Sequence, residues 1–357
     1  MRHIILLFIT LSILFSSDQR IAALGGNSGF WQTDDTNWLT FPAMINQLDI
    51  VQVSGLGDNT VPGSATLIWG EKTTFAFKYN QSIVDHEDAL RDWINIGWGN
   101  GQLGAYLNIG SKSYDSGEPN STPSSTSYYG AGLGRMTSFG ELGTSFNMLA
   151  VDDGNVNTED KGSMAFSANI RRDQNIWLFN KMLIGFDWRT LTGSDGDIDT
   201  KDSQNWIDLD VDFFTHLNPS KSVDILFALG FSYWSHTGTG IDGVSGNDDD
   251  VSQSIMTLPQ ATIAVEALLK EWAICRFGVN HAFMMGTNGD ESWSGSYNYL
   301  NDSMSTFNWN FGLGLDFSSF SVDMLIKDSF FADPIPYITG FNNADLAEGS
   351  VTLTYKF

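Results

Sequence analysis

After its N-terminus, this sequence of 357 residues contains no apolar run of the roughly 18 residues that a membrane helix needs. Proline is scarce, with 8 residues, and basic residues are few, with 18 Lys and Arg against 42 Asp and Glu. The net charge of −24 argues against nucleic acid and against an anionic cytoplasmic leaflet as partners, because both require a basic surface. Cys275 is the only cysteine, which excludes an internal disulfide and a cysteine-based metal site.

Sequence motifs that carry catalysis are also missing. The chain contains no nucleophile elbow, zinc-binding helix motif or phosphate-binding loop, and its five histidines are not paired at ligand spacing. We therefore expect a protein that is not an enzyme and has no cofactor. Asp195, Asp197 and Asp199 resemble the start of a calcium loop but lack its later Gly and bidentate Glu, so they are weak metal candidates in an acidic surface loop.

What the sequence does contain is glycine (36 residues), aromatic residues (13%) and a period-two alternation of apolar and polar side chains. The alternation starts at Leu48 and is clearest in residues 306–317, where Phe307, Trp309 and Phe311 alternate with asparagine and glycine. Such alternation is typical of strands whose two faces meet different surroundings. Because a chain without apolar helices crosses a membrane only as a closed barrel, we predict an all-β, closed antiparallel transmembrane barrel over residues 48–357.

The expected connections between strands alternate between short and long. Short ones are expected near residues 137–139, 173–174, 218–220, 270–271 and 318–319, with long polar ones between them. A soluble β-sandwich also has alternating strands, but it has no reason to sort its connections in this way. Outer-membrane barrels do, because they carry tight periplasmic turns and long extracellular loops. Counting strands gives about 14, or 16 if a short segment at residues 65–70 is included.

The N-terminus has the features of an export signal. Residues 1–23 begin with basic Arg2, continue with an apolar core too short to span a membrane, and end in small residues. We expect cleavage between Ser16 and Ala23, which would place the mature protein outside the cytoplasm.

The C-terminus has the features of a closing strand. Val351, Leu353, Tyr355 and Phe357 share one face, and the chain ends on an aromatic residue with another two positions before it. This pattern resembles the signal read by the barrel-assembly machinery. We therefore predict a location in the bacterial outer membrane, with its lipid and that machinery as partners.

Residues 20–47 do not alternate, and they combine a glycine pair, an acidic pair and a proline step. These residues are Gly25, Gly26, Asp34, Asp35, Phe41, Pro42 and Ala43. The glycine pair allows a tight bend, and the proline can start a short helix. The pattern resembles the start of the long-chain fatty-acid transporter (FadL/TodX-like) family of outer-membrane proteins and of its type IX secretion-linked (PorV-like) relatives, although Phe41 stands where that family commonly has Asn. The resemblance implies a hatch tucked inside the barrel, whose interior is too wide for its own side chains to fill.

Charged residues fall on the strand face opposite the apolar one, which would be the lumen. They are Arg171, Lys181, Asp187, Arg189, Asp208, Asp210, Asp212, Glu266, Arg276, Asp316, Asp323 and Lys327. They could bias which solutes pass, or they could pair across neighbouring strands as purely structural contacts. The three successive aspartates need cations, either from Arg189 and Lys181 or from solvent.

The leading functional hypothesis is a passive outer-membrane channel or transporter for small or hydrophobic solutes. The barrel topology, the polar lumen and the hatch motivate it. The alternative is a barrel that does not transport, and that anchors or shuttles secreted proteins or has a purely structural role. Its working surface would be the long acidic loops.

Overall fold

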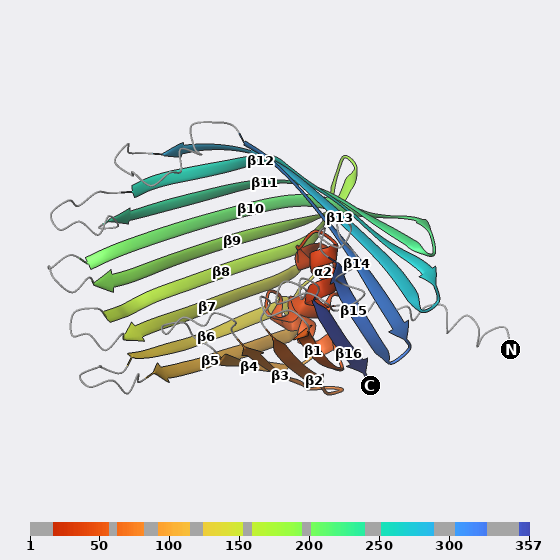
Figure 1. Ribbon diagram of the computed structural model, residues 1–357, viewed down its shortest axis with the longest axis horizontal. Helices are drawn as coiled ribbons and strands as arrows, with labels where there is room; N and C mark the ends of the chain where they lie inside the picture. Colours follow the sequence, from red (N-terminus) through yellow and green to blue (C-terminus); the bar gives the residue numbers. More distant parts are fainter. Residues whose placement is uncertain are drawn as a thin grey trace, which may run out of the picture.

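The computed structural model describes residues 17–56, 63–81, 92–114, 124–152, 159–194, 201–239, 251–288, 304–326 and 350–357. Within them the chain forms a closed barrel of 16 antiparallel strands (Figure 1). Each strand pairs with its neighbours in sequence, and β1 pairs with β16 to close the barrel. This confirms the predicted all-β, closed antiparallel barrel, and the strand count agrees with the larger of the two expected numbers.

Strand length varies around the barrel. β8 to β13 contain 16 to 20 residues each, whereas β1, β2, β15 and β16 contain 6 or 7. The strands are β1 Ile50–Leu56, β2 Ser64–Trp69, β3 Thr74–Gln81, β4 Asp92–Gly99, β5 Leu103–Tyr114, β6 Ser124–Met136, β7 Glu141–Asp152, β8 Glu159–Ile176, β9 Phe179–Ser194, β10 Lys201–Ser220, β11 Val223–Thr239, β12 Val251–Lys270, β13 Ala273–Asn288, β14 Met304–Phe317, β15 Phe320–Ile326 and β16 Val351–Lys356.

The short connections all lie at one end of the barrel, which we call the turn end; the opposite end is the loop end. The turns at residues 137–140 and 318–319 agree with the prediction, and Ser318 has the positive φ of 74° that a tight hairpin turn requires. The turns expected at residues 173–174 and 218–220 were wrong, because β8 continues to Ile176 and β10 to Ser220. β7 begins at Glu141, which pairs with Arg171 of β8. The β8–β9 hairpin continues past this point without β7 as a neighbour, and polar residues such as Asp173 remain in strand there.

Side chains divide cleanly between the two faces of the barrel wall. Leu107, Leu133 and Phe307 point outward and are 54%, 64% and 65% exposed. In the last strand, Val351, Leu353 and Tyr355 point outward, whereas Thr352 and Thr354 point inward and are almost completely buried. The outer face is therefore apolar and the inner face polar. No helix in the described part of the chain is long and apolar enough to cross a membrane.

Residues 17–49, the N-terminal segment, lie inside the barrel near the turn end (Figure 1). The segment consists of helix α2 (Asp18–Ala23) and three short 3₁₀ helices, η1 (Ser28–Phe30), η2 (Asp35–Trp38) and η3 (Pro42–Gln47). Gly25 and Gly26 adopt φ of 100° and 87°, which makes the expected bend after α2, and Pro42 opens η3.

Candidate functional site

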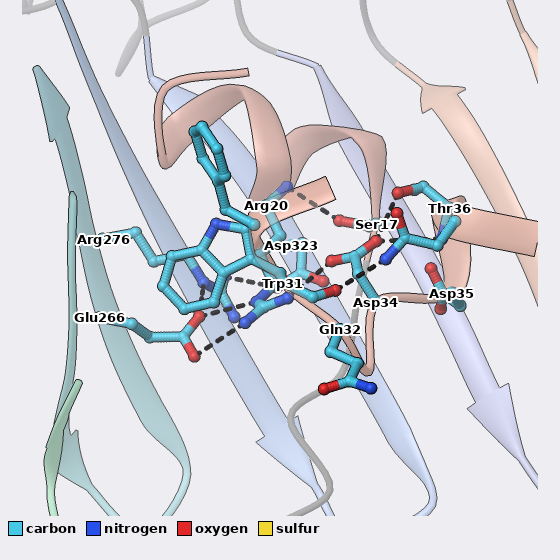
Figure 2. A network of polar contacts seen from close by, with 12 residues as sticks. Ser17, Arg20, Trp31, Gln32, Asp34, Asp35, Thr36, Glu266, Arg276 and Asp323 are labelled. Carbon is cyan, nitrogen blue, oxygen red and sulfur yellow. Dashed lines mark hydrogen bonds and ion pairs between the residues drawn. The ribbon is translucent and has the colours of Figure 1, made fainter. Parts of the chain in front are cut away.

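A buried cluster of charges joins the N-terminal segment to the barrel wall (Figure 2). Arg20 donates to Glu266 from Nε and Nη2 at 2.8 and 3.2 Å, and to Asp34 from Nη1 at 2.6 Å. Arg276 donates to the same Glu266 at 2.6 Å and to Asp323 at 2.5 Å. Because all five side chains are at most 4% exposed, solvent screens these pairs little. Two of the five residues belong to the segment and three to β12, β13 and β15.

Burial sets the ionisation of the segment's own groups. Burial alone would lower the pKa of Arg20, but the carboxylates of Glu266 and Asp34 outweigh it and raise that pKa, so Arg20 is a permanent cation. The pKa of Asp35 is raised well above its usual range, first by burial and then by the neighbouring Asp34 carboxylate. Gln52 of β1 donates to Asp35 at 3.2 Å, which ties η2 to the closing strands.

A second set of contacts fixes the segment to the opposite wall. Arg171 of β8 donates to the backbone carbonyl oxygens of Gly29 and Gln32, at 2.9 and 3.4 Å, and forms an ion pair with Glu141. His216 of β10 contacts the carbonyl oxygen of Phe30 through Nε2 at 2.9 Å. These bonds satisfy backbone groups of a segment that has few regular hydrogen bonds of its own.

Apolar contacts fill the space between the two polar walls. The Phe30 ring packs on Phe214 of β10 with centroids 5.1 Å apart, and Trp38 meets Tyr106 of β5 edge-on at 5.9 Å. The Phe41 ring lies under the Arg171 guanidinium at 4.5 Å and is completely buried. The segment is therefore packed into the barrel as a folded core and does not merely line it.

An inward-facing glycine patch receives the end of the segment. A Cβ atom at any of its members would lie within 3.0 Å of residues 38–46. The closest of these contacts, at 1.9 Å, are with the backbone oxygens of Thr40 and Pro42, so a side chain there would displace the segment. The members of the patch are Gly97, Gly99, Gly104, Gly134 and Gly143. The patch has a signal in the sequence that was not among the predictions above: glycine recurs at every second position in residues 97–99 and again in residues 130–134.

The wall on the loop-end side of the segment is acidic. Asp208, Asp210 and Asp212 point inward from β10, and Asp187 of β9 pairs in register with Asp208. Arg189 donates to Asp208 at 3.4 Å, between side chains that are 54% and 26% exposed. The expectation that Lys181 also serves these aspartates was wrong, because Lys181 lies at the turn end, where its Nζ donates to Asp173 and to Gln32, both at 3.1 Å.

The remaining predicted residues are distributed as follows. Asp316 shares the inward face of β14 with Gly314, whose position abuts Arg276. Lys327 and the weak metal candidates Asp195, Asp197 and Asp199 lie outside the described residues. Within the described ranges no group of His, Cys, Asp and Glu side chains could hold a metal ion.

The predicted charged residues thus separate into groups with different surroundings. Glu266, Arg171 and Lys181 contact the segment directly. Arg276 bonds to Glu266 and Asp323 behind that contact, whereas the aspartates of β9 and β10 line the wall beside the segment. Sequence reasoning missed Arg20, Glu141 and His216 as partners in these contacts. Arg20 and Glu266 are 246 residues apart, and no local pattern links them.

Comparison with known proteins gives only distant structural matches. No protein-family profile and no curated protein matches the sequence. Among solved structures, the siderophore receptor PirA from Acinetobacter baumannii aligns with a TM-score of 0.34 and 10% identity over 77% of this chain and 61% of the receptor. Outer-membrane expressed OmpT of Vibrio cholerae aligns with a TM-score of 0.31 and 8% identity over 86% of this chain and 94% of OmpT. The chain thus spans about three-fifths of the receptor's length, and similarity at this level carries no argument about function.

Proposed function

We propose that this protein is a bacterial outer-membrane channel or transporter for small or hydrophobic solutes, in which the N-terminal segment acts as a hatch. The observation that carries the proposal is the buried ionic contact between Arg20 and Glu266, because it attaches the N-terminal segment to the inner face of the barrel. The resemblance of residues 20–47 to long-chain fatty-acid transporters, which no family profile supports, points in the same direction.

The apolar outer face supports the membrane location. Large apolar side chains such as Leu107 and Phe307 would be exposed to water in a soluble protein, whereas lipid would cover them in a membrane. A closed barrel also satisfies every strand hydrogen bond, as lipid requires. By analogy with other barrels of this type, the turn end faces the periplasm and the loop end faces the outside.

The hatch would leave the outer half of the lumen accessible and obstruct the periplasmic half. A polar cavity of about 410 Å³ lies at the turn end between Gln32 and strands β7 to β9, and Arg171 and Lys181 are among its lining residues. Displacement of the segment beside this cavity would connect the two ends of the barrel.

Liposome flux with reconstituted protein tests the proposal. The whole protein should show low uptake of small solutes, and deletion of residues 20–47 should raise it. Because the deletion could impair assembly, a variant that keeps the segment but loses its two arginine contacts, R20M with R171M, serves as the second test. Absence of uptake in all three folded proteins would refute transport.

The anchoring alternative makes a different prediction. The acidic composition of the loop sequences favours a protein partner on the outside, as expected for a barrel that shuttles or anchors secreted proteins. Intact barrels would then retain a secreted protein in a pull-down, and shortening the loops would abolish retention without changing flux.

A further inference from the structure

A groove of about 320 Å³ runs along the outer face of the barrel near the turn end. Its lining includes Leu103, Ala105 and Leu133. These side chains point outward because the alternating residues Gly104 and Gly134 face the N-terminal segment. The groove exists because Ala105 is small while its register partners on either side, Trp98 and Leu133, are large. Its volume lies at the lower end of the range of small-ligand pockets.

One cation lies at the turn-end limit of this apolar groove. Arg135 of β6 lies opposite Leu103 of β5 and Leu142 of β7. This cross-strand row of outward side chains is the next one toward the turn end after the row that contains Ala105 and Leu133. Arg135 is exposed, and within the described ranges no carboxylate pairs with it. A second guanidinium, that of Arg172, lies over the Phe139 ring at 4.1 Å beside the same turn.

This arrangement matches the polarity of a lipid in one leaflet only. The apolar groove ends in a cation at the turn end. It therefore fits a lipid whose acyl chain is directed toward the bilayer centre and whose anionic phosphate lies at the periplasmic surface. Trp98, at the edge of the groove, has the amphipathic ring that is common at the headgroup level. A lipid of the opposite leaflet would place its phosphate at the apolar end of the groove.

We infer that this groove is a binding site for an anionic phospholipid of the periplasmic leaflet, with Arg135 contacting the phosphate and Ala105 admitting the acyl chain. The inference rests on the membrane location within the proposed function, but not on transport. A second copy of the chain is the competing occupant of such a face, and it would need no cation at one end.

Native mass spectrometry of the whole protein in detergent, titrated with phosphatidylglycerol or with phosphatidylcholine, tests this site. The wild type should retain phosphatidylglycerol in preference to phosphatidylcholine. R135Q should weaken phosphatidylglycerol binding about fivefold, the loss expected when one basic residue leaves an anionic lipid surface. A105F should fill the groove and abolish retention of both lipids although the cation remains. K221Q, at the exposed turn between β10 and β11, is the matched control and should bind as the wild type does.

Three results would overturn the inference. They are equal binding by wild type and R135Q, retention of lipid by A105F, and a dimer that forms through this face and excludes lipid. Heat-modifiable gel migration of each variant establishes that the barrel is folded. Flux measured on the same variants should equal that of the wild type. Absence of flux in every folded protein, the hatch deletion included, would count against the proposed function, whereas loss of lipid binding alone would concern only this site.

Discussion

Replacing Arg20 with methionine is the sharpest test of how the N-terminal segment is attached. The substitution keeps the apolar stem and removes the guanidinium that contacts Glu266 and Asp34. In the wild type the cluster contains two arginines and three carboxylates, so R20M leaves one arginine for three buried carboxylates. Removing one partner from a buried ion pair costs about 3–5 kcal/mol.

The expected loss applies to docking of the segment rather than to the barrel as a whole, because the strand ladder does not involve Arg20. Amide exchange of residues 24–48 should therefore accelerate between about 100-fold and a few thousand-fold in R20M, while the strands keep their protection. E266Q should have a smaller effect, since Asp34 and Asp323 remain for the two arginines.

R189M is the matched control for this experiment. Its ion pair with Asp208 is partly exposed and lies away from the segment, so its loss should change stability by less than about 1 kcal/mol. Unchanged exchange of the segment in R20M, or equal acceleration in R189M, would refute the assignment of Arg20 as the main attachment.

Three further outcomes follow from the same geometry. Because Arg20 is needed inside the barrel, signal cleavage should leave a mature chain that starts at or before Ser17, and an intact mass showing loss of Arg20 would contradict this. Folding raises the pKa of Asp35, so its stabilising contribution is complete below the unfolded pKa of about 3.9 and is lost as the pH rises through the folded pKa. D35N should thus gain melting temperature over the wild type at pH 8 but not at pH 3.5, and an equal difference at both would refute the shift. D208N with D210N should lower the cation preference of any conductance, measured as a reversal potential in a salt gradient, and an unchanged potential would exclude this wall from the pathway.

The barrel could be predicted from the sequence because its information is local. Period two places Phe307 and Leu353 outward and Glu266 inward without any knowledge of neighbouring strands. The exact turns were less predictable. The β8–β9 hairpin extends past Glu141, the first residue of β7, so Asp173 lies where alternation no longer separates lipid from lumen. In β6 the alternation is weak, because inward glycines such as Gly132 give little contrast between the two faces of the strand.

The candidate site could be predicted only in part, for a different physical reason. The residues that would face the lumen were identifiable, but their partners were not, because Arg20 meets Glu266 across 246 residues of sequence. The division between charges that contact the segment and charges that line the remaining wall depends on where the segment lies. That position is set by packing, which includes the close approach of Pro42 to Gly104 and Gly134.

The surfaces of the barrel that hold the segment differ in kind, and the difference bears on its role. If the segment never moved, apolar contacts would stabilise it most, because buried ion pairs add little stability over well-packed apolar groups of similar size. Instead, the wall opposite the glycine patch uses Arg276, Glu266 and Asp323, which stabilise the segment only while Arg20 is in place. Loss of register by a single residue would leave several buried charges without partners, so the interface favours one docked position over all partly displaced ones. Such an interface suits a segment with two discrete positions, docked or released, and this is the behaviour that the hatch proposal requires.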